Sequence, residues 1–169
     1  MMVTVRLEAP DDRPAVREVN ERAFGQPNEA DLVDTLRQRA HPFISLVATE
    51  ADTVVGHISF SPITIGEDPA PAGLGLAPMA VVPDRQNRGI GSQLVRAGLD
   101  ECRRRGIDLV VVVGHPTYYP RFGFEPGSRK GLTCEYPVPD DVFMVLELTP
   151  GAAAGRPGLV HYHPAFAEV

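Results

Sequence analysis

The sequence predicts one mixed α/β (α+β) domain, built on a central mixed sheet that is flanked by helices. Segments with strand-type alternation are interleaved with segments whose apolar residues recur at helical spacing. The run Leu109–Val113 is apolar throughout, which is typical of a parallel strand covered by helices on both faces. With 169 residues, of which 43% are hydrophobic, the chain is long enough to build one compact core.

The expected elements follow from periodicity and from the positions of turn residues. Strands are expected at 3–7, 44–49, 54–61, 74–82, 109–113 and 143–148, with a further short strand beginning at Gly123-Phe124. Helices are expected from Pro10 to Phe24, from Asn28 onward, and from Gly89 to Arg105. Asp31, three residues after Asn28, has the spacing of a capping box.

Three features qualify this pattern. Residues 65–73 are rich in glycine and proline, so we expect a mobile loop there, of the kind that often covers a binding site. Pro78 lies in the middle of the expected strand 74–82, where its missing N–H implies an edge, a bulge or a point at which two strands separate, and we expect the last of these. Along strand 54–61, polar residues at 57, 59 and 61 alternate with apolar ones, so the two sets are expected on opposite faces.

Segment 81–92 joins an apolar strand to an amphipathic helix through a turn that is rich in glycine and arginine. The first N–H groups of a helix lack intrahelical partners and lie at the positive end of its dipole, so this turn is suited to a phosphate. Gly89 and Gly91 let a ligand approach the backbone, while Arg85 and Arg88 add positive charge. A P-loop is excluded because no lysine follows Gly91, and the dinucleotide fingerprint lacks its third glycine.

Two motifs together resemble the GNAT superfamily of acyl-CoA-dependent N-acetyltransferases. The first, Gln86-x-x-Gly89-x-Gly91, is similar to the pyrophosphate loop of that family. The second, Tyr118-Tyr119-Pro120-Arg121-Phe122-Gly123-Phe124, is similar to its Phe/Tyr-Tyr-x-Lys/Arg-x-Gly-Phe segment. The resemblance covers residues 1–149, the expected GNAT acetyltransferase domain.

The end of the chain resembles a narrower group. The segment Tyr162-His163-Pro164-Ala165-Phe166 is similar to the ending of small single-domain bacterial predicted N-acetyltransferases. Residues 150–169 are therefore expected to form a C-terminal extension that docks either on the domain or on a partner subunit. Relatives of this kind are often dimers, so a homodimer is expected as a possible assembly.

The resemblance implies a splayed sheet, in which strand 74–82 separates from Leu109–Val113 and admits the pantetheine arm of CoA. Backbone groups of residues 79–82 would then pair with the amides of that arm. The residues expected to bind the cofactor are Met79, Ala80, Val81, Val82, Arg85, Gln86, Asn87, Arg88, Gly89, Ile90, Gly91, Ser92, Tyr118, Tyr119 and Phe122. The implied cosubstrate is acetyl-CoA, and no metal is expected.

Attack of an amine on a thioester requires a donor for the oxyanion and a proton for the departing thiolate. Backbone N–H groups near Ala80 and Val81 would serve the oxyanion if the strands separate there. Tyr119 occupies the family position from which a phenol reaches the CoA sulfur, and is expected to be the proton donor. Tyr118 is the second choice and is more simply explained as a wall residue.

The base is not specified by any motif. Many relatives carry a glutamate in the strand before the glycine turn, but residues 75–79 hold no acid. His115, just beyond Leu109–Val113, and His57 are the candidates with a suitable ordinary pKa, and water is a third. Glu29 and Asp31 would suit a cationic acceptor, although solvation of a helix surface explains them better.

Composition excludes several classes. A formal net charge of −6 argues against a nucleic-acid binder, because phosphate-backbone recognition requires clustered positive charge. No apolar run approaches the length of a membrane span and the first residues do not resemble a secretory signal, so a cytoplasmic protein is expected. The two cysteines have no metal spacing, and Cys102 lies on an apolar helical stripe that predicts a core position.

The sequence therefore predicts an acetyl-CoA-dependent N-acetyltransferase in which a primary amine attacks the thioester directly. The amine is not identified: a protein amine, a polyamine, an aminoglycoside-like compound and an amino-acid-like metabolite all remain open. A non-catalytic acyl-CoA sensor is the alternative, and the missing glutamate is compatible with it. A nucleotide-binding regulatory domain is a third, weaker interpretation.

Overall fold

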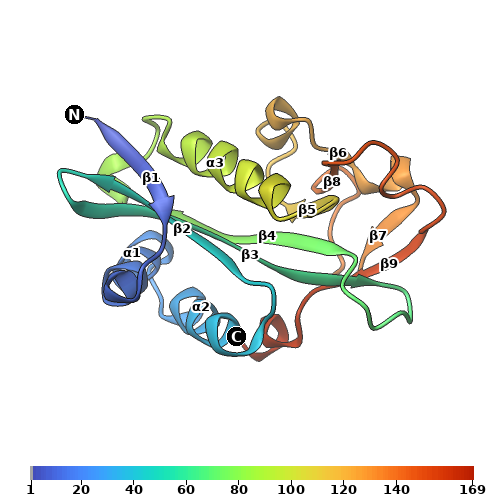
Figure 1. Ribbon diagram of the computed structural model, residues 1–169, viewed down its shortest axis with the longest axis horizontal. Coiled ribbons are helices and arrows are strands. Elements are labelled where there is room, and N and C mark those ends of the chain that lie inside the picture. Colours follow the sequence, from blue (N-terminus) through green and yellow to red (C-terminus); the bar gives the residue numbers. More distant parts are fainter. Residues whose placement is uncertain (1) are drawn as a thin grey trace.

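The computed structural model describes residues 2–169, which form one mixed sheet with helices on both faces (Figure 1). The strands are β1 (Val3–Leu7), β2 (Ile44–Glu50), β3 (Thr53–Ile65), β4 (Gly73–Val81), β5 (Leu109–Val113), β6 (Glu125–Pro126), β7 (Leu132–Cys134), β8 (Phe143–Glu147) and β9 (Gly158–His161). The α-helices are α1 (Arg13–Phe24), α2 (Asn28–Arg39) and α3 (Ile90–Arg104). Helix α3 covers one face of the sheet, while α1 and α2 cover the other (Figure 1). Within residues 2–169, no helix combines the length and the apolarity that crossing a membrane requires.

The sheet is splayed between β4 and β5, as the resemblance implied. Its main order is β1-β2-β3-β4-β5-β8-β6, and β4 and β5 are its parallel neighbours. Their pairing consists of Leu74 with Val110 and Gly75 with Val111, whereas β4 stays paired with β3 as far as Val81. Beyond Gly75 the two strands therefore separate, and we call this place the β4–β5 fork.

Pro78 lies in a bulge of β4. The register of β3 with β4 shifts between Ile58, which pairs with Met79, and Phe60, which pairs with Leu76. Because β4 carries one more residue here than β3, Pro78 is spared from donating a ladder hydrogen bond. The Ser59 hydroxyl instead donates to the Ala77 carbonyl at 3.1 Å.

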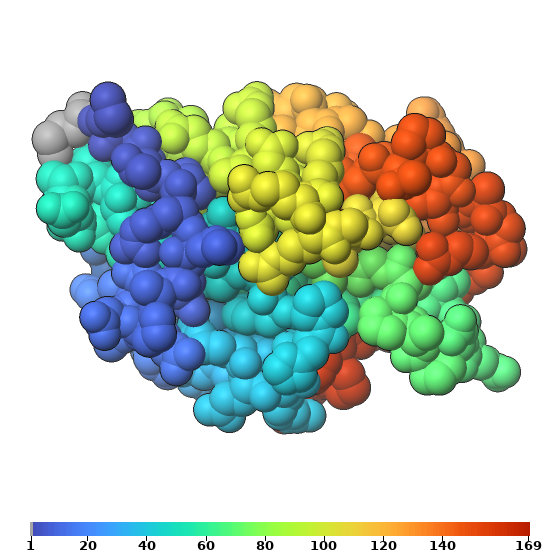
Figure 2. Space-filling view, viewed as in Figure 1, coloured from blue at the N-terminus to red at the C-terminus, as the bar shows by residue number. Residues whose placement is uncertain are grey.

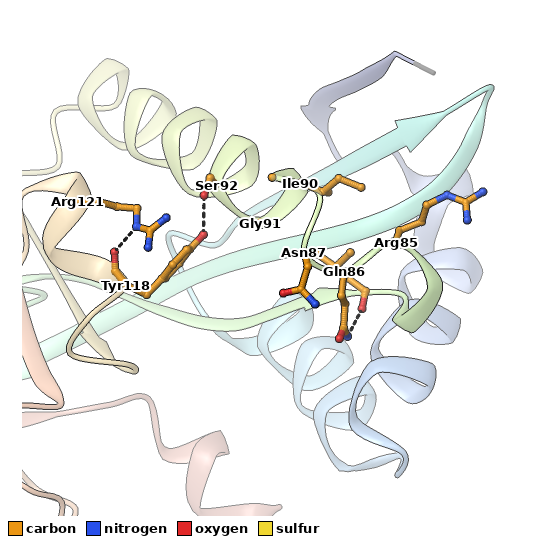
Figure 3. A pocket seen from close by; sticks show the side chains of 10 residues that line it. Arg85, Gln86, Asn87, Ile90, Gly91, Ser92, Tyr118 and Arg121 are labelled. Atoms are coloured by element: carbon orange, nitrogen blue, oxygen red, sulfur yellow. Dashed lines mark hydrogen bonds between the residues drawn. The ribbon is translucent and has the colours of Figure 1, made fainter.

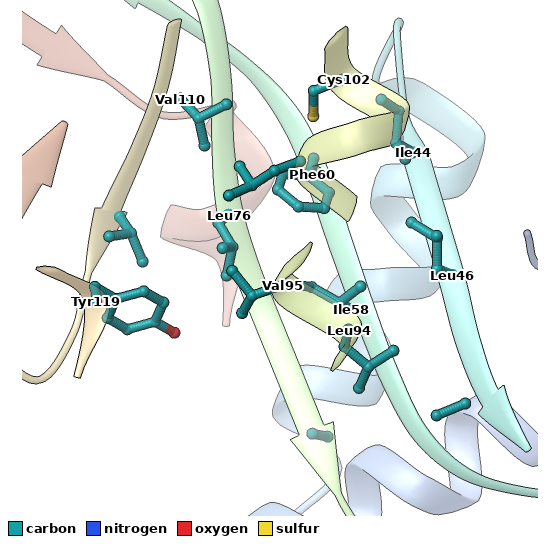
Figure 4. Close-up of a cluster of buried hydrophobic side chains, with 14 of the residues drawn as sticks. Ile44, Leu46, Ile58, Phe60, Leu76, Leu94, Val95, Cys102, Val110 and Tyr119 are labelled. Atoms are coloured by element: carbon teal, nitrogen blue, oxygen red, sulfur yellow. The ribbon is translucent and has the colours of Figure 1, made fainter. Parts of the chain in front are cut away.

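The face of the sheet under α3 is an apolar core (Figure 4). Ile58 and Phe60 from β3 pack there against Leu94 and Val95 of α3. Gly98 lets the helix approach closely, because a Cβ atom at that position would lie 2.4 Å from the Phe60 ring. Cys102 is fully buried in the same cluster and burial raises its pKa to about 12, which confirms a core role rather than a catalytic one.

Four sequence-based expectations about the elements need correction. Strand β3 continues to Ile65, so the loop is shorter than predicted and comprises residues 66–72, which protrude at one end of the molecule (Figure 2). Residues 10–12 form a separate 3-10 turn before α1. At the start of α2 the N-cap is Pro27 without a side-chain hydrogen bond, so the predicted capping box is absent. The strand expected from Gly123 comprises only Glu125–Pro126, because a 3-10 turn ends at Gly123.

The last residues of the chain are part of the sheet. Strand β9 pairs antiparallel with the end of β3 and parallel with β7, a short strand that no sequence pattern indicated. Residues 164–168 form a 3-10 turn that lies against α2, where Ala165 and Phe166 join the apolar cluster of that helix. Residues 158–168 are thus held by contacts with elements from the first half of the chain.

Candidate active site

A cavity of about 450 Å³ lies at the N-terminus of α3 (Figure 3). We call it the α3 cavity; it is lined by Val81, Arg85, Gln86, Asn87, Gly89, Ile90, Gly91, Ser92, Tyr118 and Arg121. It spans the β4–β5 fork, since Val81 is the last residue of β4 and Tyr118 follows β5 along the chain. Nine of these ten residues are among those expected to bind the cofactor, and Arg121 is the addition.

The turn before α3 exposes its backbone for a local reason. Gly89 is the N-cap residue with a φ of 83°, a left-handed conformation that strongly favours glycine. No side chain caps the helix at Gly89, so the first N–H groups of α3 are available to a ligand. The Gln86 side chain donates to the Val81 carbonyl at 2.9 Å and thereby ties the turn to the end of β4 (Figure 3).

The arginines around this cavity differ in their partners. Arg85 is bonded to Glu50 at 3.1 Å and to Asp84 at 2.8 Å, so its charge is already balanced. Arg121 donates through Nε to the Tyr118 carbonyl at 3.0 Å and stacks on the Tyr118 ring at 4.6 Å (Figure 3). Its terminal nitrogens have no carboxylate partner within residues 2–169. Arg88 is exposed and is not among the lining residues.

Six residues expected to bind the cofactor do not line the cavity: Met79, Ala80, Val82, Arg88, Tyr119 and Phe122. Ala80 and Val82 are buried in the core under α3, so a contact with a ligand in the fork is left to their backbone. Met79 lies close by, with its methyl carbon 3.6 Å from the place of a Cβ on Gly91. Phe122 meets the Tyr118 ring edge to face, with ring centroids 5.3 Å apart, and so supports this wall residue.

The two adjacent tyrosines have different surroundings. The Tyr118 hydroxyl is hydrogen-bonded to the Ser92 hydroxyl at 2.9 Å, on the wall of the α3 cavity (Figure 3). Tyr119 is only 7% exposed and its hydroxyl points from the end of β5 towards β4 (Figure 4). Burial raises the pKa of Tyr119 to about 12, so the phenol keeps its proton at neutral pH. Its ring lies on Gly114, where a Cβ would come within 2.3 Å.

Neither candidate histidine is bound to a partner at the fork. His115 is exposed in the segment after β5, and its side chain lines neither the α3 cavity nor the pocket described next. His57 is fully buried under α1 and α2, where Nε2 meets the Ser45 hydroxyl at 2.8 Å and Nδ1 meets the Asn20 amide at 3.2 Å. Burial lowers the pKa of His57 to about 3, so it is a neutral structural group and the hypothesis that it is the base is wrong.

A second cavity, of about 280 Å³, also spans the fork. We call it the aromatic pocket; it is lined by Leu76, Ala77, Val113, Tyr136, Val138, Tyr162 and Phe166. Tyr162 lies on Gly75, where a Cβ would come within 2.7 Å of its ring. The sequence contained one signal for this pocket, the aromatic ending 162–166, but periodicity could not show that it returns to β4.

The carboxylates considered for a cationic acceptor are engaged elsewhere. Asp31 is paired with Arg17 at 2.7 Å, and Glu29 accepts from the Gln26 amide at 3.1 Å. Loop 66–72 contributes no residue to the α3 cavity or to the aromatic pocket. Neither feature therefore takes part in the site that the two cavities form.

Comparison with known proteins identifies the family. The family model described as "Acetyltransferase (GNAT) domain" matches residues 4–127. The chain belongs to the GNAT acetyltransferase family. The resemblance read from the glycine turn and the Tyr118–Phe124 segment is thereby confirmed, and so is the prediction of an N-acetyltransferase rather than a non-catalytic module.

Relatives of this GNAT chain match it over most of its length. The uncharacterized N-acetyltransferase YhbS of Escherichia coli is 38% identical over 164 residues, which are 96% of this chain and 97% of YhbS. The uncharacterized N-acetyltransferase YjhQ of Escherichia coli K12 is 43% identical over 142 residues, 82% of this chain and 78% of YjhQ.

Two solved structures are similar in fold and in sequence. YhbS in complex with CoA has a TM-score of 0.89 at 37% identity, covering 98% of this chain and 92% of that one. A GNAT acetyltransferase from Brucella melitensis in complex with acetyl-CoA has a TM-score of 0.81 at 36% identity, covering 98% of both chains. These likenesses confirm the predicted fold class, including the mixed sheet flanked by helices.

Proposed function

We propose that this enzyme binds acetyl-CoA in the α3 cavity and transfers the acetyl group to a primary amine that enters through the aromatic pocket. The observation that carries the proposal is the β4–β5 fork, because both cavities are lined by residues from its two strands or from the segment that follows β5. A thioester lying in the fork would therefore be reached from either side. The CoA and acetyl-CoA complexes of the two relatives support this choice of cosubstrate.

In this proposal the phosphates of CoA lie on the free N–H groups that follow Gly89, at the positive end of the α3 dipole. Arg121 supplies a guanidinium that lines the cavity without a carboxylate partner, whereas Arg85 mainly holds the turn to Glu50. The pantetheine arm runs along β4 from Val81 towards Ala77, where β4 has no strand partner on the β5 side. Its amides then pair with the backbone of residues 79–82.

The reaction is direct acyl transfer. The amine nitrogen forms a bond to the thioester carbonyl carbon, the C–S bond breaks, and the products are an amide and CoA with a free thiol. Backbone N–H groups near Ala80 and Val81 stabilise the oxyanion. Tyr119 gives its proton to the departing sulfur, and burial keeps that proton in place beforehand. The nitrogen loses one proton to a base.

The base in this proposal is water or His115. No carboxylate belongs to the lining of either cavity in the part of the chain that the structure describes. His115 is exposed in the segment between β5 and Tyr119, so it is placed to pass a proton to solvent without occupying the fork.

Thermal unfolding with acetyl-CoA, CoA and ATP tests cofactor binding first. A ligand at about 100 times its Kd stabilises the folded state by about 2.7 kcal/mol, so acetyl-CoA and CoA should raise the Tm while ATP should not. Arg121→Met should reduce the shift. Arg103→Met, a control at the far end of α3 where Arg103 is paired with Asp100, should not. Absence of any shift with either CoA species at millimolar concentration would refute the proposal.

We also place this enzyme in the cytoplasm, since Cys102 and Cys134 are both free and a reducing compartment keeps them so. Fractionation of cells that produce the full chain would check this. The homodimer stays a prediction, for which sedimentation of the purified enzyme with and without acetyl-CoA is the measurement.

A further inference from the structure

The aromatic pocket is placed to hold the acceptor. Leu76 and Ala77 directly follow Gly75, the last residue of β4 that pairs with β5, and Val113 is the last residue of β5. The pocket therefore begins where the strands separate. Tyr162 and Phe166, two of its further walls, belong to an apolar cluster that contains no residue of α3, so this side of the pocket lies apart from the α3 core.

The chemistry of the pocket walls is apolar. None of the seven lining residues carries a charge, and three of them are aromatic. The Tyr162 ring lies 6.0 Å from that of Tyr136 and 5.3 Å from that of Phe166. Val113 and Tyr136 remain 41% and 36% exposed, so both present apolar surface that a ligand in the pocket could cover.

The carboxylate nearest to the pocket along the chain already has a hydrogen-bond partner. Glu135, next to Tyr136 in the chain, is bonded to His161 at 2.7 Å. Within residues 2–169, no carboxylate belongs to the pocket lining. A ligand with several ammonium groups would lose water there without gaining a counter-charge, and that loss is costly.

Two buried hydroxyls beside the pocket have no partner among the described residues: those of Tyr162 and Ser61. Both border Gly75, since Ser61 pairs with Gly75 across β3 and β4 and the Tyr162 ring lies on Gly75. An unsatisfied buried hydroxyl is rare and costs free energy. A small movement of the Tyr162 side chain would let its hydroxyl meet a polar group of a ligand in the pocket.

We infer that the acceptor is a small primary amine carried on an apolar, preferentially aromatic, body that fills the aromatic pocket while its nitrogen reaches the fork. This inference rests on the proposed function and narrows it. The bonds formed and broken are those of the acyl transfer above. The apolar walls favour this class over polyamines and aminoglycosides, because those would bring additional ammonium groups into a pocket without carboxylates.

The test measures acetyl-CoA-dependent release of free thiol with matched amines: 2-phenylethylamine, ethylamine, spermidine, kanamycin and a lysine-containing peptide. We expect kcat/KM for 2-phenylethylamine to exceed the others at least about ten-fold, the discrimination typical of an apolar pocket. Preference for spermidine, kanamycin or the peptide, or no turnover of 2-phenylethylamine, would overturn the inference. Failure of the proposed function is distinguishable, since acetyl-CoA would then not stabilise the fold.

A pair of variants tests the pocket itself. Val113→Asp places a carboxylate on an exposed position of the wall, while Leu159→Asp does the same at a similarly exposed site, 39%, outside the pocket. We expect Val113→Asp to lower kcat/KM for 2-phenylethylamine about ten-fold and to raise it for 1,4-diaminobutane. The acetyl-CoA-induced Tm shift should persist in both. Equal amine preferences in the two variants would overturn the assignment.

Discussion

Two buried tyrosines, Tyr119 and Tyr162, stand on opposite sides of the β4–β5 fork, and each lies on a glycine that has no room for a side chain. Tyr119 covers Gly114, only five residues earlier in the chain, and its phenol points into the fork (Figure 4). Tyr162 covers Gly75 from the other end of the chain, and its hydroxyl has no partner within residues 2–169. Burial raises the pKa of both phenols, that of Tyr162 more strongly.

This difference shows which segments of the chain form each half of the site. The α3 cavity, which we propose as the cofactor side, is built from two short segments, residues 81–92 and 118–121. The aromatic pocket, which we propose as the acceptor side, is assembled from β4, β5, residues 136–138 and the C-terminal tail. A family can therefore keep one half while changing the other, because loops and tails alter a pocket without disturbing the glycine turn.

The largest expected effect separates the two tyrosines by chemistry. Tyr119→Phe should lower kcat about 100-fold, because general-acid catalysis typically contributes at least that factor. The acetyl-CoA-induced Tm shift should remain, whereas Tyr118→Phe, which loses the bond to Ser92, should weaken that shift and spare kcat. Since the pKa of Tyr119 is about 12, wild-type kcat should not fall between pH 8 and 10 through this group. Unchanged kcat in Tyr119→Phe would remove it from the mechanism.

A second prediction concerns the polar side of the sheet. The pKa of His57 is about 3 in the folded protein, against an ordinary value of about 6.5, so as pH falls the unfolded chain takes up a proton that the folded chain does not. The free energy of unfolding is therefore independent of His57 above about pH 6.5 and decreases as the pH falls below that value. The expected decrease between pH 7 and pH 5 is about 2 kcal/mol.

Urea unfolding at both pH values measures this loss. His57→Asn should remove most of the pH dependence, and His115→Asn, at an exposed position, should not. A wild-type free energy of unfolding that is flat from pH 7 to pH 5 would show that His57 is not buried as a neutral group.

The glycine turn offers a smaller effect with an internal control. Gly89 needs a φ of 83°, so Gly89→Ala should destabilise the turn by about 1–2 kcal/mol and weaken CoA binding accordingly. Gly91 is helical, and a Cβ there would meet its nearest atom, the Tyr118 hydroxyl oxygen, at 3.4 Å, an ordinary contact. Isothermal titration with CoA should show a clearly smaller loss of affinity for Gly91→Ala than for Gly89→Ala. Equal losses in both variants would contradict the role given to the Gly89 conformation.

The smallest expected effect has the opposite sign and lies on the acceptor side. Tyr162→Phe removes a buried hydroxyl that has no partner among the described residues, so it should raise the free energy of unfolding by about 1 kcal/mol. Chemical denaturation without ligand is the measurement, with Tyr118→Phe as the comparison, since that change removes a hydroxyl that is bonded. Destabilisation by Tyr162→Phe would show that its hydroxyl is satisfied in solution.

Local features predicted the helix start after Gly89 and the apolar strand Leu109–Val113. The two GNAT-like motifs then implied the fork and nine of the ten residues that line the α3 cavity. Arg121 belongs to the Tyr118–Phe124 motif but was not predicted to line the cavity, because its approach to the cavity depends on stacking against Tyr118.

The acceptor side depended on contacts between distant segments. Nothing in the composition of residues 150–169 indicates that β9 joins β3 and β7 or that Tyr162 reaches Gly75. His57 was likewise a candidate base on the ground of its ordinary pKa. Only the packing of α1 against β3 shows that this side chain is buried, neutral and structural. Residues close in the chain determine turns and helix starts through sterics and hydrogen bonding, whereas burial, and with it the pKa of a buried group, is decided by whichever distant segment covers it.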